Sequence, residues 1–158
     1  MPVIEHEISI HAPIHLCFDL ARNVEAHVAS TGRTRERAVA GVTSGLLENS
    51  DTVTWEAVHF GVRQRLTAQI TEMNPPSDFT DIMVKGAFHS FEHRHQFFEV
   101  GNGTIMRDTF QYKSPFGAIG RLADRLFLER YMRRFIEFRA HELKRMAEKQ
   151  ALVQKEQT

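Results

Sequence analysis

The residues best suited to chemistry in this sequence are two histidines, His93 and His95, and one carboxylate, Asp108. The histidines are two residues apart in a segment with strand-like alternation, so their side chains point to the same face. Asp108 lies in the next such segment, and His59 lies in an earlier one. An imidazole oriented by a carboxylate can hold a ligand hydroxyl or carbonyl, or transfer a proton as a general acid or base. His95 or His93 with Asp108 is therefore the candidate catalytic group, and His59 is a further polar residue that could join it.

The same three residues have two other interpretations. A buried imidazole and a buried carboxylate satisfy each other's hydrogen bonds, which would make the group purely structural. Two histidines and an aspartate are also a ligand set for zinc. The sequence contains no HExxH or CxxC motif to support a metal, and we expect neither a metal nor another cofactor. Nucleophile elbows, phosphate loops and dinucleotide fingerprints are also absent, which excludes most common enzyme classes.

A predicted hairpin places these residues relative to one another. Asn102-Gly103 separates two alternating segments and predicts a type I′ turn in which these are the two loop residues. In that register His95 lies opposite Phe110 and diagonal to Asp108, close enough for the two side chains to meet. Period-two alternation then places eight residues on one face: Phe91, His93, His95, Phe97, Met106, Asp108, Phe110 and Tyr112.

The rest of the chain supplies the elements that must position this hairpin. Alternation predicts strands over residues 3–10, 37–43, 52–60, 62–73, 79–87 and 91–100, with a partner strand after the hairpin turn. Pro13 opens a short helix, and a second covers residues 24–30. Ser114-Pro115 begins a helix that runs to about Lys149, and its apolar face changes in a way that indicates a break or kink near residues 128–131. The order predicts an α+β fold with a curved antiparallel sheet of about six to seven strands, covered by the long C-terminal helix.

Composition narrows the class of protein. The chain has 158 residues, of which 42% are hydrophobic and 25% are charged, as expected for one globular domain over residues 1–150 with a frayed tail over 151–158. The formal net charge is zero, which argues against nucleic acid as a partner. We find no signal peptide and no apolar run long enough to cross a bilayer, so we expect a cytoplasmic protein without integral membrane association. The single cysteine, Cys17, is expected to be a buried structural thiol.

The predicted C-terminal helix carries most of the positive charge. Residues 115–150 contain nine Lys or Arg and five Asp or Glu. Such a helix could attract an acidic surface, lipid headgroups or nucleic acid, or it could be a solvated face with internal ion pairs. We favour the second interpretation because acids are interspersed, for example Glu129 one turn before Arg133.

The order of elements resembles the START-like superfamily, also called SRPBCC or helix-grip proteins, and in particular its small bacterial, polyketide cyclase/dehydrase-like members. The resemblance covers about residues 3–149. The segments that carry it are residues 8–13 (ISIHAP), 53–55 (VTW), 59–62 (HFGV), 93–97 (HRHQF), 103–108 (GTIMRD) and 114–117 (SPFG).

This resemblance implies a cavity between the sheet and the C-terminal helix for a small hydrophobic ligand such as a lipid or a polyketide-like molecule. The expected function is binding, as a carrier or a sensor. The alternatives are a cyclase or dehydratase with a His–Asp proton shuttle, and a protein-interaction module that uses the basic helix. The expected ligand-binding residues are Trp55, His59, Leu66, Phe91, His93, His95, Phe97, Asp108, Phe110, Leu122 and Leu126. The oligomeric state is left open.

Overall fold

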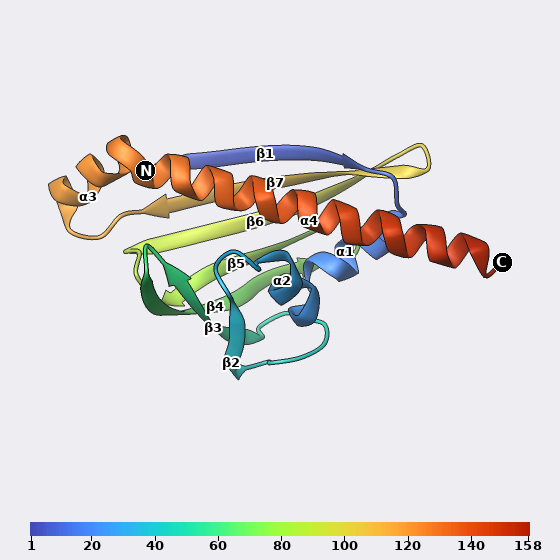
Figure 1. Cartoon of the computed structure of the whole chain (residues 1–158), viewed down its shortest axis with the longest axis horizontal. Coiled ribbons are helices and arrows are strands. Elements are labelled where there is room, and N and C mark those ends of the chain that lie inside the picture. Colours follow the sequence, from blue (N-terminus) through green and yellow to red (C-terminus); the bar gives the residue numbers. More distant parts are fainter.

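A computed structural model describes all residues from Met1 to Thr158. It contains one antiparallel sheet and a small set of helices, which confirms the expected α+β fold (Figure 1). The strands are β1 (Val3–Ile10), β2 (Arg37–Gly41), β3 (Thr52–His59), β4 (Val62–Asn74), β5 (Asp78–Lys85), β6 (Ser90–Val100) and β7 (Gly103–Lys113). The helical segments are α1 (Ile14–Ala21), α2 (Val24–Ser30), α3 (Gly117–Ala123), the π-helical segment η1 (Asp124–Leu128) and α4 (Glu129–Glu156).

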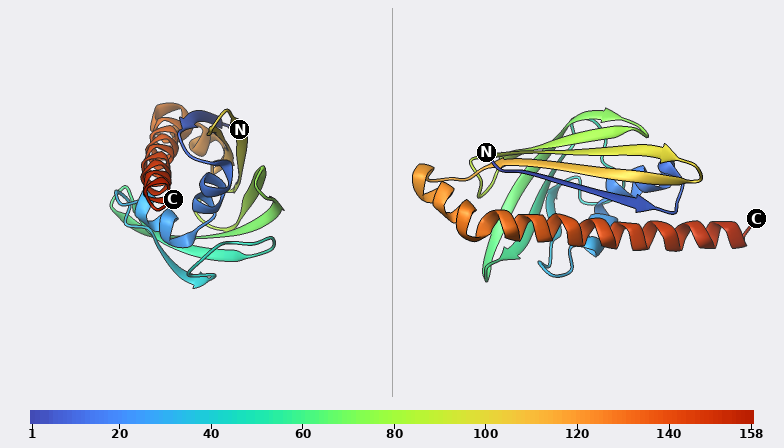
Figure 2. Two further views of the ribbon diagram at one scale, coloured as in Figure 1. Left: turned by 90° about the vertical axis from the view of Figure 1, so that its right-hand side faces the viewer. Right: turned by 90° about the horizontal axis from the view of Figure 1, so that it is seen from above.

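The sheet has seven strands in the order β1-β7-β6-β5-β4-β3-β2. Only β1 joins the sheet out of sequence order, because it pairs with the last strand rather than with β2. Seen along its length, the sheet curls around α4, and α1 and α2 lie inside the curl (Figure 2). This is the helix-grip arrangement, in which one long helix covers the apolar face of an antiparallel sheet.

The β6–β7 hairpin has a different register from the one predicted. Val100 pairs with Gly103, so the loop residues are Gly101 and Asn102. Only Gly101 has a positive φ, of 58°, which is the pattern of a type II′ turn with glycine first. The correction shifts the pairing by two residues and therefore leaves every side chain on its predicted face. It also places His95 directly opposite Asp108 rather than diagonal to it.

Gly103 is required for a reason other than a positive φ. A Cβ on this residue would lie 2.9 Å from the carbonyl oxygen of Ile10 in β1. We expect Gly103→Val to lower the free energy of unfolding by about 1–3 kcal/mol because the added side chain pushes β1 away from β7. Urea denaturation measures this. Gly101→Ala, which meets open space but keeps a positive φ, should cost about 1 kcal/mol, and no cost at all would contradict the type II′ register.

The core is divided into two clusters along α4. Around the second half of α4, the short helices α1 and α2 fill the space against the sheet, with Phe18 packed edge-on to Phe79 and Phe97 at 5.6 and 5.4 Å. Cys17 is fully buried there. Around the first half of α4 no such helices intervene, and the smaller cluster consists of Ile4, Ala68, Phe91, Phe110, Tyr112, Met132 and Ile136. Space is therefore expected between the sheet and the first half of α4.

The C-terminal helical region differs in detail from the prediction. It begins at Gly117 rather than at Pro115, because Phe116 adopts a left-handed conformation and the Ser114 hydroxyl donates to the Asp124 carboxylate. The change of apolar face is produced by the π-helical turn of η1, which ends at Leu128, where the predicted break begins. The helix continues to Glu156, so most of residues 151–158, expected to be frayed, are helical. Glu129 and Arg133 form the expected pair at 3.8 Å.

Candidate functional site

A cavity of about 300 Å³ lies between the first half of α4 and the sheet. Its wall comes mainly from β3, β4 and β6 and from α4, and 13 of its 22 lining residues are hydrophobic. These hydrophobic residues are Trp55, Ala57, Phe60, Leu66, Ala68, Ala87, Phe88, Phe91, Phe110, Leu128, Tyr131, Met132 and Phe135, and Pro115 lies beside them. A mostly apolar lining with a few polar groups is typical of sites for small molecules.

Six of the residues expected to bind ligand line this cavity: Trp55, His59, Leu66, Phe91, His93 and Phe110. Phe97 instead packs in the larger core cluster against Phe18, because α1 fills that end of the sheet. Leu122 and Leu126 point away, with 57% and 68% of their surface exposed, since the π-helical turn separates their face from the inward face of α4.

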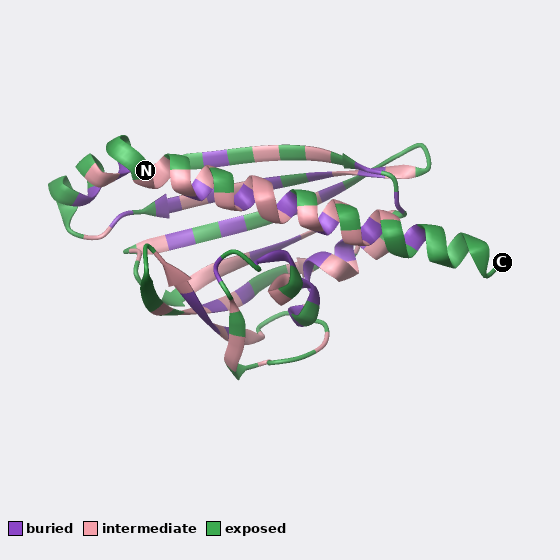
Figure 3. Cartoon of the chain, in the orientation of Figure 1, coloured by how far each residue is buried: buried purple, intermediate pink, exposed green.

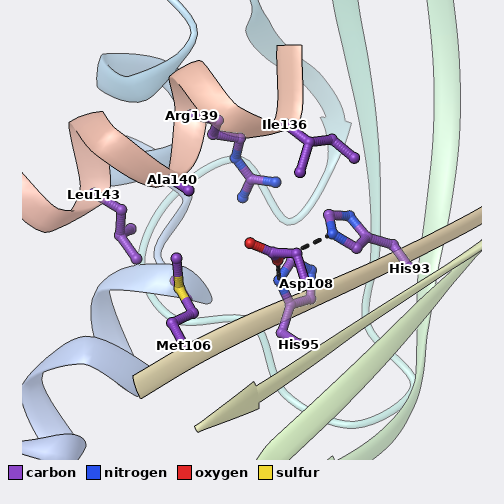
Figure 4. Close-up of a pocket in the computed structure, with 9 residues that line it drawn as sticks. His93, His95, Met106, Asp108, Ile136, Arg139, Ala140 and Leu143 are labelled. Carbon is purple, nitrogen blue, oxygen red and sulfur yellow. Dashed lines mark hydrogen bonds and ion pairs between the residues drawn. The ribbon is translucent and has the colours of Figure 1, made fainter. Parts of the chain in front are cut away.

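The remaining two expected residues, His95 and Asp108, lie behind the cavity wall in a small adjoining pocket of about 20 Å³. Figure 4 shows Asp108 beside the two histidine rings, with an interaction to each of them. His93 Nε2 lies 3.1 Å from Asp108 Oδ1, and His95 Nδ1 lies 2.8 Å from the same oxygen. His95 Nε2 lies 3.3 Å from Asp81 Oδ1. Two imidazoles and two carboxylates thus form one continuous buried network.

The network shifts the pKa of its members. Burial alone would raise the pKa of Asp108, but hydrogen bonds from His93 and His95 outweigh burial and hold that pKa well below its usual value. Burial would lower the pKa of His95, but Asp108 and Asp81 raise it above its usual value. For His93, burial and the neighbouring His95 lower the pKa. Of the two rings, His95 is the one whose charged form its two carboxylate partners favour, and His93, which faces the cavity, is the one whose neutral form burial favours.

A second polar group comes from residues that the sequence did not single out. His27 Nε2 lies 2.6 Å from Glu36 Oε2, and the His27 ring stacks on Trp55 with centroids 3.9 Å apart. Burial would raise the pKa of Glu36, but its pairing with His27 lowers it. Further along β3, His59 Nδ1 lies 2.6 Å from the Tyr131 hydroxyl. These pairs leave little free hydrogen-bonding capacity on that part of the cavity wall.

Arg139 differs from these paired residues. Its side chain comes from α4 and borders both the cavity and the small pocket, with the guanidinium directed toward Asp108 and His93 (Figure 4). Its Nε is buried without a hydrogen-bond partner, and the guanidinium forms no ion pair within 4.0 Å. A guanidinium carries five donors and no acceptor, so Arg139 offers unused donors at the inner end of an apolar cavity.

The structure changes the set of residues that could hold a metal ion. The sequence suggested His93, His95 and Asp108, whereas the ligating atoms that lie within 4.8 Å of one another belong to Asp81, His93 and His95. Asp108 instead accepts from both rings. The hydrogen bonds of the network account for this geometry without an ion, and the positive charge of Arg139 beside the same pocket opposes a bound cation.

The polar site residues His27, Glu36, Asp81 and Arg139 were not predicted from the sequence. Arg139 had a detectable signal, since it lies one turn after Phe135 on the helix face that also carries Met132 and Ile136. Glu36 lies in a loop and Asp81 in a strand whose alternation did not distinguish it, so only the folded chain brings them to the cavity.

The fold and the cavity together define a START-like, helix-grip protein. Solved structures agree on the fold, with a Thermus thermophilus protein (TTHA0849) at a TM-score of 0.75 and 22% identity, covering 91% of this chain and 95% of that chain. A START superfamily protein from Mycobacterium smegmatis has a TM-score of 0.72 at 12% identity, covering 93% and 97%. Protein CV1439 from Chromobacterium violaceum has a TM-score of 0.70 at 10% identity, covering 92% and 96%.

The chain belongs to the polyketide cyclase/dehydrase and lipid transport family, whose model matches residues 10–139. The family and the START-like neighbours support a hydrophobic ligand-binding fold. A comparison with curated proteins found no match. None of the helices combines the length and the apolar character needed to cross a bilayer.

Proposed function

We propose that the protein binds a small hydrophobic ligand, such as a lipid or a polyketide-like molecule, as a carrier or a sensor. The observation that carries this proposal is the cavity of about 300 Å³ with its largely aromatic and aliphatic lining. That volume lies at the lower end of the range for small-molecule sites. The ligand-binding residues that we propose on this wall are Trp55, His59, Leu66, Phe91, His93 and Phe110.

The inner end of the cavity suggests that the ligand carries an acceptor oxygen. Arg139 supplies donors that no protein group uses, and its Nε is buried without a hydrogen-bond partner. Leaving such donors unpaired in a largely apolar site is costly, and an oxygen on the ligand would remove that cost. The apolar body of the ligand would then lie against Trp55 and Phe91, and its oxygen would lie near Arg139.

Native mass spectrometry of the protein purified from its own organism tests the binding function and identifies the ligand. We expect one small organic molecule per chain, which extraction and fragmentation would name. A protein that carries nothing and does not bind an apolar probe such as N-phenyl-1-naphthylamine would overturn the proposal.

Arg139→Leu should remove the preference for oxygen-bearing ligands. Displacement of bound N-phenyl-1-naphthylamine by 2-decanone and by n-decane measures this preference. We expect the variant to bind 2-decanone about tenfold more weakly, because a hydrogen bond to a charged group is lost, with little change for n-decane. Arg134→Leu, an exposed position on the same helix, is the matched control. Equal losses for the two ligands would exclude a hydrogen bond from Arg139.

A cyclase or dehydratase activity is the second candidate function. It is favoured by one observation, the placement of His93 on the cavity wall with Nε2 held by Asp108 at 3.1 Å and a pKa that burial lowers. That is the arrangement of a general base. A base beside a bound ketone would exchange its α-protons, so NMR of 2-decanone in D₂O should show exchange that disappears in His93→Phe. Exchange no faster than in buffer would exclude this activity on simple ketones and leave the binding function.

A further inference from the structure

Large apolar side chains cover the outer face of the region between β7 and α4. We call this surface the apolar tip: Phe116, Ile119, Leu122, Leu126 and Phe127. Each is at least half exposed, with Phe116 at 83% and Ile119 at 74%. Their spacing of three to four residues places most of them along one side of α3 and η1. Contiguous apolar surface of this kind is rare on monomers and marks a site of contact with a partner or a membrane.

The apolar tip projects beyond the end of the sheet. Figures 1 and 3 show α3 at the opposite end of the molecule from the C-terminus, with most of its surface exposed. No strand or helix packs against its outer face. The tip therefore projects with its outer face accessible, which suits a soft, extended surface better than a groove-forming protein partner.

The apolar tip is continuous with the mouth of the cavity. The Phe60 ring lies 5.7 Å from Phe127 and 4.5 Å from Tyr131 between centroids. Phe60 and Tyr131 both line the cavity, as do Pro115 and Leu128 from the chain on either side of the tip. Phe60 is itself 59% exposed. An apolar path thus leads from the tip to the cavity.

The charge around the apolar tip is positive. Residues 113–134 contain six Lys or Arg and only two Asp or Glu. Of the two acids, Asp124 is buried against Ser114 and Glu129 pairs with Arg133. Basic side chains beside exposed Leu, Ile and Phe are the pattern of a helix that inserts at the surface of an anionic bilayer.

We propose that the apolar tip docks on the surface of an anionic membrane, with its apolar side chains at the boundary of headgroups and acyl chains and its arginines on the lipid phosphates. The mouth of the cavity then faces the bilayer, the phase in which a hydrophobic ligand concentrates. The docking does not depend on the proposed ligand binding, since it requires only the exposed residues and their charge.

Vesicle flotation of the full chain tests the docking. We expect binding to vesicles of phosphatidylcholine with about 30% phosphatidylserine, weaker binding to pure phosphatidylcholine, and weaker binding in high salt. Leu126→Glu and Leu122→Glu should each reduce binding to anionic vesicles by at least about tenfold, because a charge would replace an apolar side chain that inserts into the bilayer. The matched control is Leu152→Glu, which lies 62% exposed near the far end of α4 and should bind like the wild type.

Several results would overturn the docking proposal. The first is an absence of binding to anionic vesicles, and the second is an equal loss of vesicle binding in all three variants. The third is a dimer in solution that the tip variants convert to a monomer, because the tip would then be the contact with a second copy of the chain. Circular dichroism and N-phenyl-1-naphthylamine binding of each variant separate docking from folding and from the cavity. If the chain binds vesicles but not the probe, the docking proposal stands and the proposed ligand binding is wrong. If the chain binds the probe but not vesicles, the proposed ligand binding stands and the docking proposal is wrong.

Discussion

Asp108→Asn is expected to lower the free energy of unfolding by about 3–5 kcal/mol, since it removes one partner of a buried charge network. Asp108 is 5% exposed and accepts from both His93 and His95. The variant leaves His95 with Asp81 as its one carboxylate partner, at 3.3 Å. Urea denaturation measures the change. Glu7→Gln, which removes a half-exposed carboxylate paired with Arg107, is the control and should cost less than about 1 kcal/mol.

The cost of Asp108→Asn should depend on pH in a defined direction. The folded-state pKa of Asp108 is lowered, so its contribution is present above the unfolded pKa of about 4 and is lost as the pH falls. The folded-state pKa of His95 is raised, so its contribution is complete below about pH 6.5 and is lost as the pH rises through the raised value. The difference between wild type and variant should therefore be largest between about pH 4 and pH 6.5. A difference that stays constant from pH 3 to pH 8 would contradict the ion-pair assignment.

Ala57→Phe is expected to abolish ligand binding while the domain stays folded. Ala57 lines the cavity from β3, so a phenyl ring at this position would occupy the space proposed for the ligand. We expect the affinity for N-phenyl-1-naphthylamine to fall at least about tenfold, because a filled cavity cannot bury the probe.

Val58→Phe is the matched control for Ala57→Phe. It adds an aromatic ring to the neighbouring residue of β3, whose side chain points to the other face of the sheet. Its probe affinity should equal that of the wild type. If both variants bind the probe normally, the probe does not occupy the cavity, and if both lose binding, the loss reflects the sheet as a whole.

The sequence predicted faces better than it predicted register. Alternation is a local property, so it correctly placed Phe91, His93 and His95 on the same side as Asp108 and Phe110. The hairpin register depends on which two residues form the loop, and Gly101-Asn102-Gly103 allows more than one choice. Gly101 in the first loop position satisfies a type II′ turn, and this choice also lets Gly103 pass close to Ile10 in β1, a contact that no local pattern encodes.

The candidate site was only partly predictable for a related reason. The aromatic residues of the strands could be assigned to the inner face, but which end of the sheet α1 and α2 would fill could not. Phe97 therefore lies in the core rather than in the cavity wall. Leu122 and Leu126 lie outside the cavity because η1 changes which helix face points inward. The turn contains no Gly or Pro, so the sequence does not mark this change. Arg139 lies near His93 only because α4 crosses the sheet at that point, which the sequence does not specify.

Whether the cavity binds a small hydrophobic ligand is decided by a fluorescence titration of the wild-type chain with N-phenyl-1-naphthylamine. We expect saturable binding of one probe molecule per chain, with emission shifted to the blue as the probe leaves water. Emission that rises without saturation, or does not change, would mean that the cavity does not accept an apolar molecule and would contradict the proposed function.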